Sequence, residues 1–166
     1  MACVKDQPKE DYANVWAAGV VSASLDDVVR TFGHGSRKRE RHGQSLVNLD
    51  NALRSCGIRA KLWLGGSFVT AKPDPADIDA VIWPAGHIFT ADNLERASHV
   101  LRHKLLRNNF GMDVHIEPIS NDEMFERELH YLGFYGYGWD RRTPRTIVEV
   151  MIGSAAASCT ADPHQK

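Results

Sequence analysis

The sequence has few cysteines, almost no net charge and no long apolar run. Its three cysteines, Cys3, Cys56 and Cys159, lie far apart, which gives neither a metal-ligand cluster nor a disulfide framework, so we expect a cytoplasmic protein. Without a run of about 18 apolar residues, we expect no membrane span. The start, MACVKDQPKE, carries no apolar stretch typical of a secretory signal. A formal net charge of -1 argues against nucleic-acid binding by overall charge, although it leaves room for a local basic patch.

What the sequence does contain is the composition of one globular domain. Of its 166 residues, 43% are hydrophobic and 25% are charged. A chain of this length can bury a substantial core. We predict a flexible N-terminus over residues 1–13, a single domain over 14–152 and a disordered tail over 153–166.

Hydrophobic periodicity, glycine and proline predict how helices and strands follow one another. Ser24 with Asp27 resembles a capping box and starts a short helix. Gly57 and Gly111 end two later helices. The predicted helices cover residues 24–32, about 36–55, 91–108 and 121–132, and the predicted strands cover 61–64, 77–83, 112–118 and 146–152. This order predicts an α/β (α+β) fold, with a mixed sheet of about four to five strands flanked by helices.

Two other groups of residues have simple structural interpretations that we prefer. The basic run 36–42, SRKRERH, is typical of a solvated helix face, and a site that faces phosphates is the alternative. A cluster of aromatic residues near the C-terminal end could stack on a base, but such residues more often pack in the core or at its rim. The cluster consists of Tyr131, Phe134, Tyr135, Tyr137 and Trp139.

The turn Gly65-Gly66-Ser67 directly follows a predicted strand. Two glycines let the backbone turn tightly and let a ligand approach closely. The backbone N–H groups and the serine hydroxyl can donate hydrogen bonds to phosphate oxygens. Taken alone, such a turn is weak evidence for a site, because most turns of this composition bind nothing.

A pair of aspartates, Asp77 and Asp79, opens the next predicted strand. Side chains alternate along a strand, so the two carboxylates share one face while Ile78 points into the core. Like charges this close repel each other by about 1 kcal/mol in water. A cation between them would remove that repulsion, and carboxylate oxygens suit Mg²⁺. The alternative is a pair of solvated acids at the end of a strand.

The spacing of these two features resembles a known family. Gly66-Ser67, nine intervening residues and then Asp77-Ile78-Asp79 resemble the signature of the DNA polymerase beta-like nucleotidyltransferase superfamily, and more narrowly that of the small bacterial minimal nucleotidyltransferases. A looser resemblance to small uncharacterised bacterial and phage proteins of this superfamily covers residues 15–152. The resemblance implies a metal-dependent enzyme that moves a nucleoside monophosphate from an NTP to an acceptor hydroxyl.

The resemblance also implies roles for individual residues. Asp77 and Asp79 would bind magnesium, together with a third carboxylate for which Asp113 is the first candidate and Glu149 the second. Gly65, Gly66 and Ser67 would bind the triphosphate. Lys72 could contact a phosphate, but it could equally be a surface lysine. Two Mg²⁺ ions are expected, and Mn²⁺ could replace them.

The resemblance leaves the acceptor open: it could be a protein, a tRNA or a small molecule. A cognate partner protein in a toxin–antitoxin or phage-defence pair is suggested by the resemblance alone. Two other functions remain as alternatives. One is a catalytically degenerate module that binds a nucleotide or a partner, and the other is a structural or interaction domain in which the motif is a remnant.

Overall fold

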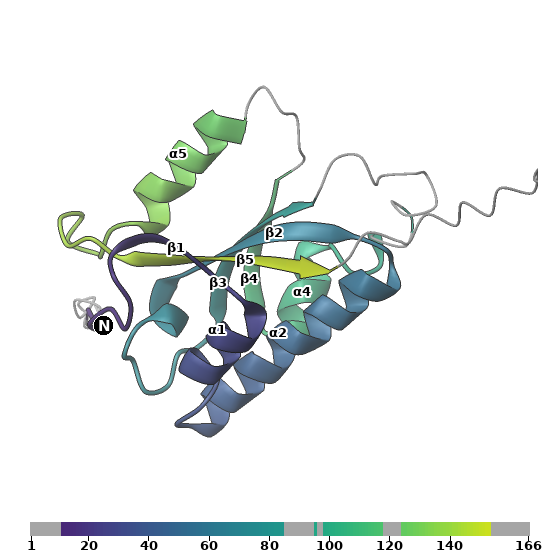
Figure 1. The fold of residues 1–166 in the computed structure, drawn as a ribbon, viewed down its shortest axis with the longest axis horizontal. Helices are drawn as coiled ribbons and strands as arrows, with labels where there is room; N and C mark the ends of the chain where they lie inside the picture. The colour runs from purple at the N-terminus through teal and green to yellow at the C-terminus, as the bar shows by residue number, and fades with distance from the viewer. Residues whose placement is uncertain (1–10, 85–94, 96–97, 118–123, 154–166) are drawn as a thin grey trace, which may run out of the picture.

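A computed structural model describes residues 11–84, 95, 98–117 and 124–153, which build an open, mixed, five-stranded sheet flanked by helices (Figure 1). The strands are β1 (Gly19–Ala23), β2 (Arg59–Gly65), β3 (Ile78–Pro84), β4 (Met112–Ile116) and β5 (Thr146–Gly153). The helices are α1 (Leu25–Phe32), α2 (Arg37–Ser55), α4 (His103–Phe110) and α5 (Met124–Tyr135), with a short 3-10 helix, η1 (Gly66–Val69). The predicted fold class is confirmed.

The strand order is β1-β5-β2-β3-β4. The outer pairs, β1 with β5 and β3 with β4, are parallel, whereas β2 runs antiparallel to both of its neighbours. β3 and β4 therefore begin at the same edge of the sheet, and the end of the antiparallel β2 reaches that edge as well. The beginnings of β3 and β4 and the turn after β2 consequently meet at one point.

Two of the helices begin at serine caps. The Ser24 hydroxyl accepts a hydrogen bond of 3.1 Å from the Asp27 N–H, and α1 starts at the next residue. The Ser36 hydroxyl accepts one of 3.3 Å from the Arg39 N–H and begins α2 in the same way. Such caps satisfy N–H groups that have no partner within the helix. The sequence predicts the start of α1 from the Ser24 cap, and it predicts a helix beginning near residue 36 from its apolar stripe, without the cap at Ser36.

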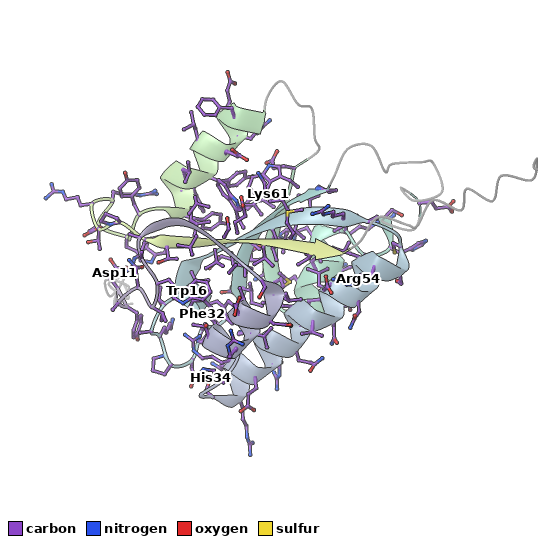
Figure 2. The ribbon with its side chains drawn as sticks, viewed as in Figure 1. Asp11, Trp16, Phe32, His34, Arg54 and Lys61 are labelled. Atoms are coloured by element: carbon purple, nitrogen blue, oxygen red, sulfur yellow. The ribbon has the colours of Figure 1, made fainter. Side chains whose placement is uncertain are left out.

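The two faces of the sheet carry different cores. The first face packs on α1, α2 and α4 through aliphatic residues such as Leu46, Leu49, Leu62, Ile82 and Leu106. The second face lies under α5, across the sheet from α1 and α2 (Figure 1). Its core is mainly aromatic and consists of Trp63, Trp83, Tyr131 and Tyr135 with the aliphatic Val81 and Ile147. Lys61 lies on this second side, where its ammonium pairs with Glu128 of α5 (Figure 2).

The structure differs from the sequence prediction in three elements. β1 is an additional strand, and it forms because it pairs with β5 more than 120 residues later in the sequence. The predicted helix 91–108 is wrong at residues 99–102, where the chain turns before α4 begins at His103, and much of its first half lies outside the described residues. α5 ends at Tyr135, three residues later than predicted. These differences leave the sheet edge that carries the aspartates unchanged.

The described parts of both predicted termini contact the domain. The ion pair between Asp11 and Arg145 and the hydrogen bond from Arg145 to the Tyr12 carbonyl hold the N-terminal segment against the chain just before β5. Gly153, which the prediction assigns to the tail, is the last residue of β5. Residues 1–10 and 154–166 lie outside the described residues, and the single domain over 14–152 stays a prediction.

Candidate functional site

Asp79 is the second residue of β3, whereas Asp77, the predicted first residue of this strand, lies immediately before it because the ladder pairing with β4 begins at Ile78. Ile78 lies between them, is fully buried and belongs to the aliphatic core on the α2 side of the sheet. Asp77 and Asp79 are only half-buried. Because side chains alternate along a strand, the Asp79 carboxylate belongs to the opposite face, which α5 covers.

Asp113 is the direct neighbour of Asp79 in the sheet. The two residues are Cα partners in the parallel pairing of β3 with β4, so their side chains project from the same face. Asp113 is half-buried, and its Oδ1 atom lies 3.0 Å from Nε2 of His103 on α4. A third carboxylate thus stands beside Asp79.

The Gly-Ser turn meets Asp79 on the other side of β3. Gly65 at the end of β2 is the Cα partner of Asp79. Gly66 has φ +63°, and a Cβ atom added to it would overlap Oδ2 of Asp79. Glycine is therefore required at position 66 both for its backbone conformation and for the close approach of this carboxylate.

Ser67 is half-buried within η1, directly after Gly66. Its carbonyl accepts hydrogen bonds of 3.3 Å from the Thr70 N–H and 2.8 Å from the Thr70 hydroxyl, which fix the turn. The Ser67 side chain thus belongs to a closed turn that begins beside the Asp79 carboxylate.

Tyr135 of α5 covers this group of residues. Its ring packs against the turn so closely that a Cβ atom on Gly65 would lie 2.8 Å from Cδ1 of Tyr135. Burial is the main reason that the pKa of the Tyr135 phenol is raised, and the negative charges of Asp79, Asp113 and Asp77 raise it further. All three aspartates thus lie close enough to Tyr135 for their charges to raise the pKa of its phenol.

The chemistry of this donor set fits a hard divalent cation, but the side chains do not form a ready ligand set. Carboxylate oxygens are the ligands that Mg²⁺ takes, usually one or two from the protein with the rest from substrate phosphates and water. Within the described ranges, no group of three His, Cys, Asp or Glu side chains is placed to hold a metal ion together. The contact with His103 occupies Oδ1 of Asp113 and leaves Oδ2 as the oxygen that could become a ligand.

Glu149, the second candidate for the third carboxylate, lies farther away. It is on β5, two strands from β3 in the sheet order, and its Cα partner on β2 is Trp63. It accepts hydrogen bonds from Trp63 Nε1 at 3.0 Å and from the Ser22 hydroxyl at 3.1 Å. The geometry therefore favours Asp113 over Glu149 as the neighbour of Asp79.

Comparison with known proteins places the chain in a family. Residues 8–151 match the model of a family of unknown function, DUF6932. The chain belongs to the DUF6932 family. No curated protein and no solved structure matches it. The match to DUF6932 spans the three aspartates, the Gly-Ser turn and Tyr135, but the family itself brings no established activity.

Lys72, predicted to contact a phosphate or to be a surface lysine, lies in the chain between η1 and Asp77. Its ammonium stands over the ring of Tyr12, 5.7 Å from the ring centre. A lysine over an aromatic face gains about 0.5–1 kcal/mol at an exposed site. The contact that the structure describes for Lys72 is therefore with the N-terminal segment and not with the carboxylates.

Two residues of the basic run 36–42 are buried, which the prediction from the sequence does not anticipate. Arg39 is 7% exposed and His42 is 6% exposed, so the interpretation of this run as a solvated helix face is wrong for both. Arg37, Lys38 and Arg41 are exposed, as predicted. Helical spacing carries the relevant signal, because positions 39, 42 and 46 recur at intervals of three and four and Leu46 is apolar. Arg39 and His42 thus belong to the buried face of α2.

Proposed function

We propose that this protein is a metal-dependent nucleotidyltransferase that moves a nucleoside monophosphate from an NTP to an acceptor hydroxyl. The observation that carries the proposal is the close contact between Gly66 and the carboxylate of Asp79. A turn with the composition of a phosphate cradle touches the carboxylate of one aspartate, while Asp113 lies beside that aspartate in the sheet. The family resemblance of the Gly66-Ser67 and Asp77-Ile78-Asp79 motif supports the same activity.

In this mechanism the protein mainly positions the reacting groups and neutralises the charge of the triphosphate, as phosphoryl-type transfer requires. The backbone N–H groups of Gly66 and Ser67 and the Ser67 hydroxyl would donate hydrogen bonds to the β- and γ-phosphates. Asp77 and Asp79 would hold the metal, and Asp113 would hold a second ion or accept the proton of the attacking hydroxyl. When bound, Mg²⁺ supplies charge neutralisation on the triphosphate and lowers the pKa of that hydroxyl.

The bond changes of the reaction are simple. The acceptor oxygen forms a bond to the α-phosphorus, the bond from this phosphorus to the bridging oxygen of the β-phosphate breaks, and pyrophosphate leaves. The proton of the acceptor hydroxyl passes to Asp113 or to water. Tyr135 would act as a wall of the site, since its ring packs on the Gly65 turn.

The acceptor and the biological setting belong to the same proposal. Protein hydroxyls, tRNA ends and small molecules are the acceptor classes that the family resemblance suggests, and a cognate partner in a toxin–antitoxin or phage-defence pair is a further expectation. We propose that the protein works in the cytoplasm. No helix in the part of the chain that the structure describes is long and apolar enough to span a membrane.

One observation favours a second candidate function. Asp113 is bonded to His103, and no three metal-binding side chains within residues 11–84, 98–117 and 124–153 converge on one point. A degenerate member of the superfamily that binds a nucleotide or a partner without catalysis would accommodate this arrangement. Nucleotide binding without turnover across a panel of acceptors would select this alternative.

Label transfer from α-labelled NTP tests the proposal. The purified protein is incubated with Mg²⁺, the labelled NTP and protein, tRNA or small-molecule acceptors, and the label on each acceptor is measured. Asp77→Asn and Asp79→Asn should abolish transfer while circular dichroism shows a folded protein. Asp26→Asn on α1 is the matched control, because Asp26 is exposed and far from β3 in the sequence. Transfer that survives in both the Asp77 and the Asp79 variants would overturn the mechanism.

A further inference from the structure

Three side chains at the beginning of α2 bind the segment that separates the Gly-Ser turn from Asp77. The residues are Ser36, the N-cap of α2, and Arg39 and His42, which lie three positions apart on the buried side of its first turns. The segment is residues 68–76, here called the spacer. Arg39 and Ser36 bind its first part, and His42 binds its last part.

Arg39 makes most of these contacts. Its guanidinium donates to the carbonyls of Phe68 at 3.0 Å, Thr70 at 2.6 Å and Lys72 at 2.6 Å and 3.1 Å. A further bond of 2.9 Å goes to the Phe32 carbonyl at the end of α1. One planar group thus holds alternate carbonyls of the spacer to two helices. A lysine could not do so, because its single ammonium cannot reach carbonyls spread across the fork of an arginine.

The other two side chains extend the contact towards Asp77. The Ser36 hydroxyl donates to the Pro73 carbonyl at 3.0 Å, and Nε2 of His42 lies 3.2 Å from the Pro75 carbonyl. Because a carbonyl only accepts, His42 carries its proton on Nε2. The ring of His42 also packs edge-on against Phe68, with ring centres 5.8 Å apart. His42 therefore touches both ends of the spacer.

The spacer needs such support because its own sequence cannot provide regular hydrogen bonds. Pro73 and Pro75 have no N–H group, and proline excludes helix and interior strand conformations. Burying an arginine among carbonyls is also unfavourable: burial lowers the pKa of Arg39, and the charge of Asp74 opposes that change. Arg39 nevertheless fixes the first half of the spacer to α2, and His42 fixes the last part.

We propose that Arg39, assisted by Ser36 and His42, is a positioning residue that sets the distance between the Gly66-Ser67 turn and Asp77. This inference rests on the proposed function, because the distance matters only if phosphate and metal are bound together. Ser36, Arg39 and His42, together called the clamp, hold the spacer at residues 68, 70, 72, 73 and 75, between the turn and Asp77.

The test compares Arg39→Lys with the control Arg41→Lys in the full chain. Arg41 lies in the same basic run but is exposed. Hydrogen exchange of the backbone amides should become faster over residues 68–77 in Arg39→Lys and stay unchanged elsewhere and in the control. The transfer rate per folded molecule, measured well below the melting temperature, should fall by about 10- to 100-fold, because small misplacements of reacting groups are costly. The Mg²⁺ concentration for half-maximal rate should rise.

A second variant protects the test against a failure to fold. His42→Phe keeps an aromatic ring beside Phe68 and removes the donor to the Pro75 carbonyl, so faster exchange should be confined to residues 73–77. Unchanged exchange in the spacer in both variants would overturn the inference. Faster exchange with a normal transfer rate and normal Mg²⁺ dependence would overturn it as well, because the clamp would then be purely structural. Absence of transfer in the wild-type protein would instead refute the proposed function.

Discussion

The carboxylate of Asp79 lies directly against the Cα atom of Gly66, across the antiparallel pair β2–β3. The contact exists because Gly65 and Asp79 are Cα partners and because Gly66 turns the chain with φ +63° immediately after that pair. A side chain at position 66 would displace the carboxylate. The glycine, the aspartate and the turn therefore form one structural unit, and the first prediction tests it.

Gly66→Ala should destroy the site. The added Cβ overlaps Asp79 Oδ2 and the positive φ is strained for alanine, so we expect stability to fall by at least about 1 kcal/mol. We also expect Mg²⁺-dependent NTP binding, measured by calorimetry, to be lost. Gly133→Ala on α5 is the matched control, because nothing lies within 4 Å of a Cβ atom there. Alanine at 133 should leave binding intact and stabilise the helix by about 0.5–1 kcal/mol. Normal NTP binding by Gly66→Ala would contradict the account.

The choice between Asp113 and Glu149 gives a second prediction. Asp113→Asn should lower the rate of label transfer by about 100-fold or more, because a positioned acid or base contributes that much. Glu149→Gln should leave the rate unchanged. It should lower the stability by about 1–2 kcal/mol, since the bonds from Trp63 and Ser22 lose a charged acceptor. Thermal unfolding and transfer assays on both variants separate the two effects. If Glu149→Gln lowered the transfer rate and Asp113→Asn did not, Glu149 on β5 would be the third carboxylate instead.

The arrangement of the site could be predicted from the sequence where local alternation determines it. Alternation along a strand predicts that Asp79 and Asp113 project from one face, and the structure pairs the two residues near the beginnings of parallel neighbours, with Asp77 just before β3. The turn after β2 follows from its two glycines. These features depend on residues within a few positions of each other, which is where sequence patterns are informative.

The rest depends on contacts between distant residues. β1 is a strand only because β5 lies beside it, and its sequence, GVVSA, has no strong pattern of its own. Arg39 is buried by its hydrogen bonds to carbonyls of the spacer. These partners lie about thirty residues later in the chain, so the residues next to Arg39 do not reveal them. Tyr135 packs on Gly65 through the docking of α5, which no local pattern specifies. The sequence shows which residues are aromatic or basic, but among them only the helical spacing of positions 39, 42 and 46 indicates burial.

The pH dependence of stability gives a third prediction. The pKa of Tyr135 is raised in the folded protein, first by burial and then by the nearby aspartates. Its unfolded value is about 10. The folded state therefore binds the phenol proton more tightly than the unfolded state does. Its contribution to the free energy of unfolding is fully present below a pH of about 10 and is lost as the pH rises above that value. Tyr135→Phe should lose less stability than the wild type between about pH 10 and 12 in urea titrations. Parallel curves over that range would contradict the burial of the phenol among the aspartates.

A crystal structure with Mg²⁺ and a non-hydrolysable NTP tests the central claim most directly. The account predicts metal density bridging the carboxylates of Asp77 and Asp79 to the triphosphate, with the β- and γ-phosphates on the Gly66-Ser67 turn. It also predicts that the Asp113 carboxylate turns from His103 towards the metal. A triphosphate bound elsewhere, or metal density away from β3, would contradict the account.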